Sequence, residues 1–159
     1  MPLEYVVPVY NRPRMRSRST QIIIFLLILI AWIVSFFLPS INTGSVRPGY
    51  IAAAMSMSVL YSMERSAWGE HLYLGSFWIA NLFMLAAPFG LWRVRKGKGG
   101  VFLALMVCWD LLTLSYVCYD RMTHKFTGVL FGYFVWEAAL VAMTLLLFAV
   151  RFAEKRSRA

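Results

Sequence analysis

Four long apolar runs most strongly constrain how this chain can fold. A run of about 18 or more apolar residues is typical of a transmembrane helix, because about 20 residues cross a hydrocarbon core about 30 Å thick. No polar stretch between the runs is long enough for a separate soluble domain. The sequence therefore predicts an all-α, polytopic membrane four-helix bundle. The four predicted spans are 21–38, 72–91, 101–119 and 128–152.

The composition agrees with a membrane protein. The chain is 60% hydrophobic and 14% charged, whereas about a quarter of the residues of a soluble domain are charged. The first run follows an arginine-rich arm, as a signal peptide does, but it is longer than a signal-peptide core and lacks a clear cleavage site. We therefore expect a retained helix, with residues 1–20 as a basic arm, 21–152 as the transmembrane domain and 153–159 as a basic tail.

Positive charge predicts the orientation of the spans. Of the 16 Lys and Arg residues, twelve fall in the N-terminal arm, the loop after the second span and the C-terminal tail. These segments share one side of the predicted bundle, so the positive-inside rule puts both termini in the cytoplasm. The same charge favours anionic lipid as a partner. Few aromatic residues lie among the basic ones, so no nucleic-acid partner is expected.

Two segments between the spans carry further signals. Pro39 and the turn-rich residues 42–45 predict an end to regular structure after the first span. Apolar residues spaced at about i, i+4 and i+8 within 48–63 predict an amphipathic exoplasmic helix on the bilayer surface or capping the bundle. Pro88 and Gly90 predict a bend in the second span.

Three polar side chains lie inside the apolar runs. Asn81, Asp110 and Glu137 each lie nine residues from the exoplasmic end of a predicted span, about 13 Å deep at 1.5 Å per residue. We expect them to form one polar layer near the midplane and to face one another inside the bundle. Helical spacing adds three supporting residues, which are Thr113, Tyr133 and Thr144.

No Lys, Arg or His lies at the depth of the two acids in the predicted spans. Repulsion between like charges and loss of solvent both favour the protonated form, so the pair is expected to keep at least one proton and to titrate as a unit. Three roles stay open. The layer can hold the helices in register, pair with a basic residue of a partner subunit, or load and release a proton or cation.

Metal and catalytic signals are weak. His71 and His124 at the exoplasmic edge suggest a haem, and Met55 and Met57 with His71 suggest a copper site. Interfacial histidines are more often solvated and methionines more often pack, so no metal or cofactor is expected. The sequence also lacks the metalloprotease, nucleophile-elbow and nucleotide-binding motifs, which predicts a protein that is not an enzyme.

Short motifs support a resemblance. They are Leu38-Pro39 after the first span, Ala80-Asn81 in the second, and Gly132-Tyr133 with Trp136 in the fourth. On these residues the chain resembles a loose set of small bacterial four-helix membrane proteins of unknown function. The resemblance implies residence in the bacterial inner membrane and implies no activity.

Together these features predict a non-enzymatic accessory or interaction subunit of an inner-membrane assembly. Its expected partner is a membrane protein or another copy of the chain. The alternative is a small proton- or cation-coupled transporter that uses Asp110 and Glu137.

Overall fold

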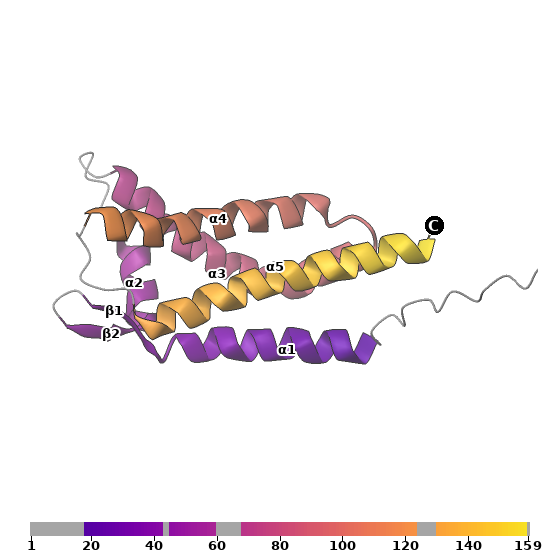
Figure 1. Ribbon diagram of the computed structural model, residues 1–159, viewed down its shortest axis with the longest axis horizontal. Helices are drawn as coiled ribbons and strands as arrows, with labels where there is room; N and C mark the ends of the chain where they lie inside the picture. Colours follow the sequence, from indigo (N-terminus) through magenta and orange to yellow (C-terminus); the bar gives the residue numbers. More distant parts are fainter. Residues whose placement is uncertain (1–17, 43–44, 60–67, 124–129, 159) are drawn as a thin grey trace, which may run out of the picture.

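The computed structural model describes residues 18–42, 45–59, 68–123 and 130–158, and five helices account for most of them (Figure 1). The elements in chain order are α1 Arg18–Ser35, β1 Pro39–Asn42, β2 Val46–Pro48, α2 Gly49–Val59, α3 Trp68–Arg95, α4 Gly100–Thr123 and α5 Phe131–Arg158.

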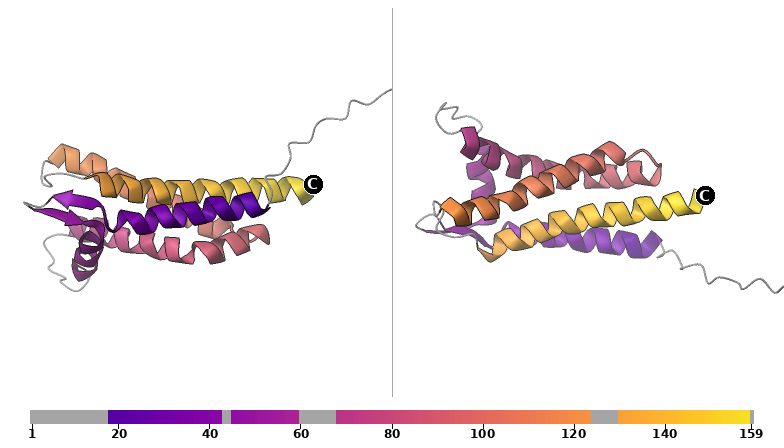
Figure 2. Two further views of the ribbon diagram at one scale, coloured as in Figure 1. Left: turned by 90° about the horizontal axis from the view of Figure 1, so that it is seen from below. Right: turned by 45° about the horizontal axis from the view of Figure 1, so that its top comes forward.

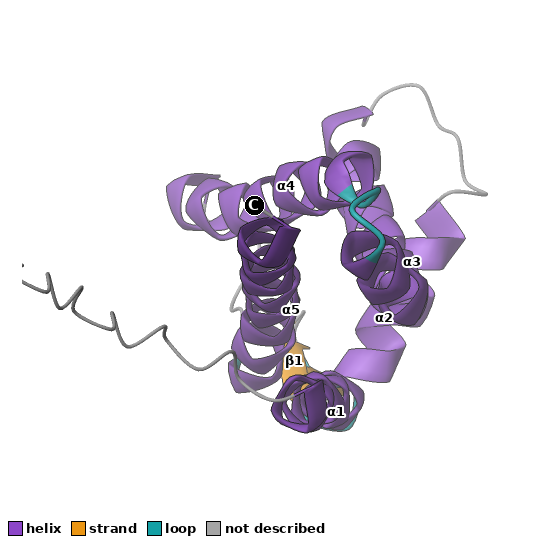
Figure 3. Cartoon of the chain, turned by 90° about the vertical axis from the view of Figure 1, so that its right-hand side faces the viewer, coloured by secondary structure: helices purple, strands orange, loops and turns teal. Residues whose placement is uncertain are grey.

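The four long helices lie side by side, with their axes roughly aligned (Figures 1 and 2). Helix α5 contacts α1, α3 and α4, and α3 also packs along α4. Figure 3, which looks along the helices, shows α5 between α1 and α4 with α3 opposite. The short elements β1, β2 and α2 gather at one end, next to the start of α5.

Three helices are long and apolar enough to cross a membrane, which supports a membrane protein. They are α1, residues 75–95 of α3 and residues 131–157 of α5. In α4, the part with described side chains gives an apolar segment at residues 100–115, and the helix itself continues to Thr123. The predicted fourth span at 101–119 therefore stays a prediction.

The helix bounds differ from the predicted ones at several ends. Helix α1 covers 18–35 rather than 21–38, because residues 36–38 form tighter turns in which each N–H bonds the carbonyl three residues back. Helix α5 continues to Arg158, through the predicted tail. Residues 153–158 contain no glycine or proline and are mostly good helix formers, so nothing stops the helix at 152. The predicted arm lies almost wholly outside the described residues.

A short β-hairpin occupies the segment where the sequence predicted no regular structure, and that prediction was wrong. Strands β1 and β2 pair antiparallel, with Pro39 opposite Pro48 and Asn42 opposite Val46. The N–H groups of Gly49 and Tyr50 then bond the carbonyls of Leu38 and Phe36, at 3.0 and 2.8 Å. The two strands are close in the sequence, which favours pairing of these short flanks as a hairpin. The predicted surface helix at 48–63 corresponds to α2 over 49–59, and residues 60–63 lie outside the described residues.

The hairpin is attached to α5 by close backbone contact. The N–H of Leu130 bonds the carbonyl of Ser40 at 3.0 Å. A Cβ at Gly132 would lie 2.7 Å from the Pro39 carbonyl oxygen and 2.5 Å from Ser40 Oγ. Only glycine lets the start of α5 come this close, so Gly132 joins the hairpin to the helices.

The connection between α3 and α4 is a tight turn. Gly97 has a φ of 78°, and the N–H groups of Gly97 and Lys98 bond the carbonyls of Val94 and Arg93 at 2.9 and 3.0 Å. This is the glycine cap that commonly ends a helix. Helix α3 runs through Pro88 without a break, and the ring of Phe102 on α4 fills the space where Gly90 has no side chain.

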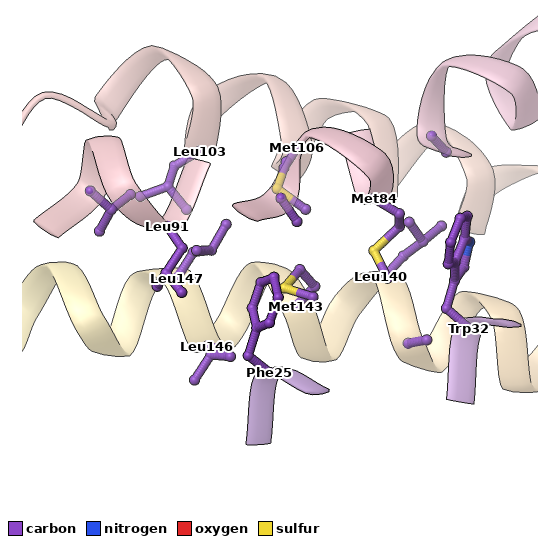
Figure 4. Packing of buried hydrophobic residues seen from close by; sticks show 14 of the residues in the cluster. Phe25, Trp32, Met84, Leu91, Leu103, Met106, Leu140, Met143, Leu146 and Leu147 are labelled. Atoms are coloured by element: carbon purple, nitrogen blue, oxygen red, sulfur yellow. The ribbon is translucent and has the colours of Figure 1, made fainter. Parts of the chain in front are cut away.

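The apolar core lies between α5 and the pair α3 and α4 (Figure 4). Met84 of α3 lies beside Leu140 of α5, and Leu91 lies beside Leu147. Phe25 enters the same core from α1. Long unbranched methionines adapt to irregular spaces between helices. The opposite faces of the helices expose large apolar side chains, as lipid-facing surfaces do.

Candidate functional site

Both acids of the predicted polar layer belong to the buried faces of their helices. Glu137 is 5% exposed and Asp110 is 8% exposed. On α5 the buried stripe passes through Tyr133, Glu137 and Thr144 at helical spacing, and on α4 it passes through Asp110 and Thr113. Both carboxyl groups therefore point into the protein and away from the outer surface.

Thr113 connects the two helices at this level. Its Oγ1 lies 3.1 Å from Glu137 Oε1, and also 3.1 Å from the backbone carbonyl oxygens of Trp109 and Asp110. A threonine hydroxyl carries one hydrogen and two acceptor lone pairs. In an apolar helix that hydrogen commonly serves the carbonyl three or four residues back.

At Glu137 the Thr113 hydroxyl donates to Oε1, so one hydrogen serves three acceptors, the carboxyl group and the two backbone carbonyls. Glu137 therefore receives only a shared hydrogen bond from Thr113.

Asp110 and Thr144 complete the group. Asp110 interacts electrostatically with Glu137, and Thr144 lies beside the Asp110 carboxyl. Thr144 Oγ1 nevertheless meets no hydrogen-bond geometry with any described residue, and Glu137 Oε2 likewise has no described partner. Thr144 is 5% exposed. Glu137 Oε2 and Thr144 Oγ1 are therefore two buried oxygen atoms that can each accept a further contact.

Tyr133 lies one turn before Glu137 and closes the group on one side. Its hydroxyl donates to the carbonyl of Thr113 at 2.7 Å and also lies near the Glu137 carboxyl. Its ring packs with Phe77 and Trp136, at centroid distances of 5.7 and 5.6 Å. These aromatic rings separate the acids from the end of the molecule that carries the hairpin.

Asn81 has partners that the sequence did not indicate. Its Oδ1 accepts hydrogen bonds from the indole Nε1 of Trp32 on α1, at 3.0 Å, and of Trp136 on α5, at 2.8 Å. Because Trp136 precedes Glu137, this three-helix junction lies at about the level of the acids. Asn81 Oδ1 thus binds the two tryptophans rather than the carboxyl groups.

The structure therefore brings together five of the predicted residues, which are Asp110, Glu137, Thr113, Tyr133 and Thr144. Sequence reasoning missed Trp32 and Trp136 as polar partners. A signal was present, because a buried indole N–H usually finds an acceptor, and Asn81 is the only amide in the four predicted spans apart from Gln21 at the start of the first.

The weaker metal candidates lie outside what the structure describes. His124 lies outside the described residues. His71, Met55 and Met57 belong to described helices, but the positions of their side chains are not described. Within the described residues no group of three or more His, Cys, Asp or Glu side chains could hold a metal ion. For Glu137, the charged neighbour within the described part is Asp110, another acid.

Comparison with known proteins returned no match. No protein-family profile, curated protein or solved structure is similar to the chain at a significant level.

Proposed function

We propose that the chain is a small proton- or cation-coupled transporter of the bacterial inner membrane, in which Asp110 and Glu137 exchange a proton for a cation. The observation that carries this proposal is that Asp110 and Glu137 are both buried between the helices, and that the charged neighbour of Glu137 within the described residues is Asp110, another acid. Intramembrane carboxyl groups that face the protein interior commonly belong to proton or ion pathways.

The exchange follows from which oxygens are already bonded. Glu137 Oε1 contacts Thr113, whereas Glu137 Oε2 and Thr144 Oγ1 have no described partner. When Glu137 loses its proton, these two oxygens and the Asp110 carboxyl can surround a monovalent cation, which replaces the lost positive charge. When the cation leaves, the pair takes up a proton again, since two ionised carboxylates cannot stay together in a dry site.

Membrane placement is part of the proposal. The start of α1, the α3–α4 turn and the end of α5 lie at one end of the molecule, and most described basic residues lie there (Figure 1). This supports a four-helix bundle with both termini in the cytoplasm and α2 at the exoplasmic end. Four helices enclose little space, so we propose a homo-oligomer as the working unit.

The role of accessory subunit stays a prediction, and one version of it loses support. Pairing with a basic residue of a partner needs an acid on the outer surface. Asp110 and Glu137 are both buried against other helices of the same chain. A partner would therefore have to bind the apolar outer faces of the helices, and these faces suit lipid equally well.

The test uses purified protein in liposomes that contain a pH-sensitive dye. A sodium or potassium gradient is imposed, and proton movement is followed for wild type, Glu137→Gln and Asp110→Asn. Each amide keeps the shape of the acid but cannot release a proton. We expect both variants to lose proton movement by at least about tenfold, because general acid–base groups contribute about 10²–10⁴-fold where a proton must move.

Glu154→Gln is the matched control, since it removes a carboxyl group from the far end of the same helix α5. It should behave as wild type. Wild-type liposomes that respond no faster than empty ones under both gradients would refute the transport proposal.

A further inference from the structure

The turn between α3 and α4 carries a dense patch of positive charge. Arg93, Lys96 and Lys98 are exposed there, and Arg151 of α5 reaches the same place. Glu154 is the one acidic side chain described at this end of the molecule. The patch is defined here as Arg93, Lys96, Lys98 and Arg151, and is called the basic turn.

Arg151 is positioned against the start of α4. Its two terminal nitrogens lie 3.2 Å from the point where a Cβ on Gly100 would stand. The first turn of α4 contains no acidic residue. A guanidinium and the positive end of a helix dipole thus lie together, an arrangement that an anion between them would stabilise.

Aromatic side chains border the basic turn on its apolar side. Lys96 Nζ lies 3.9 Å from the ring centroid of Trp92, and the Arg93 guanidinium carbon lies 5.6 Å from that of Phe89. Trp92 is 52% exposed, and Phe89 is exposed beside it. Exposed aromatics with basic neighbours are typical of the headgroup level of a bilayer, where the stems stay in the apolar layer and the charges reach the phosphates.

We infer that the basic turn binds the phosphate headgroup of an anionic phospholipid in the cytoplasmic leaflet. The two non-bridging oxygens of a phosphodiester match the fork of the Arg151 guanidinium, while Lys98 and Arg93 neutralise the remaining charge. The acyl chains would lie along the exposed apolar faces of Phe89 and Trp92. This inference rests on the membrane orientation proposed above, and it is independent of any exchange at Asp110 and Glu137.

Native mass spectrometry of the full-length protein tests the site. Equal amounts of phosphatidylglycerol and phosphatidylcholine are added in detergent, and the bound lipid is counted for wild type, Arg151→Gln and Arg156→Gln. Arg156 is an exposed basic residue one to two turns further along the same helix, so it is the matched control. We expect wild type to retain phosphatidylglycerol preferentially. Arg151→Gln should retain about fivefold less phosphatidylglycerol, which is the effect typical of one basic residue at the membrane surface.

Lys98→Gln gives a second reading if Arg151→Gln does not yield folded protein, and it should lower retention in the same direction. Excess inorganic phosphate should leave the lipid bound. Equal losses for Arg151→Gln and Arg156→Gln, or no preference between the lipids in wild type, would overturn the inference. Full displacement by inorganic phosphate would also overturn it, because the site would then select free phosphate.

Discussion

At the scale of single residues, Thr113 links the two helices that carry the buried acids. Its one hydroxyl hydrogen faces three oxygen acceptors, two of them backbone carbonyls of its own helix. Thr144 differs, since its hydroxyl is buried beside the Asp110 carboxyl group and makes no such set of bonds. The same residue type thus joins two helices in one position and lies beside an acid in the other.

Valine substitutions should separate these two roles. Thr113→Val removes a buried hydrogen-bond partner of Glu137 Oε1, and we expect it to lower the free energy of unfolding by about 1–3 kcal/mol. Thr144→Val replaces a hydroxyl that lies beside Asp110 but has no partner of good geometry among the described residues with a methyl of similar shape, so stability should fall less than in Thr113→Val. Unfolding followed by circular dichroism in detergent measures both. Equal losses for the two variants would contradict these assignments.

Asn81 should be important for stability. Asn81→Leu would leave the buried indole N–H groups of Trp32 and Trp136 without their acceptor, at a cost of about 1–3 kcal/mol each. Leu82→Ala, on the exposed face one residue further along α3, is the control and should cost much less. Thermal unfolding in detergent distinguishes them. A stable Asn81→Leu protein would show that the two indole bonds contribute little.

Much of the site was predictable from residue spacing. Asp110 with Thr113, and Tyr133 with Glu137, share helical faces, and an acid in an apolar run has to point inward. The partners of Asn81 were not predictable, because Trp32 lies 49 residues away and its approach depends on how α1 is rotated. Helical periodicity fixes the face of one helix and does not fix which face of another helix meets it.

At the scale of elements, two glycines allow close approach but differ in what they face. A Cβ at Gly132 would meet the backbone oxygen of Pro39, whereas a Cβ at Gly90 would meet the side-chain ring of Phe102. A ring can turn aside more easily than a backbone carbonyl. We therefore expect Gly132→Ala to destabilise more than Gly90→Ala, with the larger cost at about 1–3 kcal/mol.

Thermal unfolding of the two alanine variants, with Gly90→Ala combined with Phe102→Leu as a third protein, tests this order. The smaller leucine should restore most of the stability lost in Gly90→Ala. A Gly132→Ala protein as stable as wild type would show that the hairpin can move away from α5 without cost.

The elements also show where sequence patterns are informative. Apolar runs located α1, α3 and α5 to within a few residues, because span length is set by the bilayer. The hairpin at 39–48 was missed, since its two prolines and turn residues resemble a loop and its strands are too short to show alternation. Helix α5 continues beyond the predicted span, because the charged residues after 152 are mostly good helix formers.

At the scale of the whole molecule, charge is distributed unevenly from end to end. The described basic residues of α1, α3 and α5 gather opposite the hairpin (Figure 1). An alkaline phosphatase fused after Arg158 should therefore be inactive and a fluorescent protein at the same position bright, since both termini are expected in the cytoplasm. Phosphatase inserted between Asn42 and Ser45 of the hairpin should be active. An active C-terminal phosphatase fusion would reverse the proposed orientation.

An infrared difference spectrum between acidic and alkaline pH tests the exchangeable proton on Glu137 most directly. We expect the carbonyl stretch of a protonated carboxyl group in wild type, absent in Glu137→Gln, kept in Glu154→Gln, and weakened when sodium or potassium is added. The same band in Glu137→Gln as in wild type, or no such band at any pH, would contradict a proton held at Glu137.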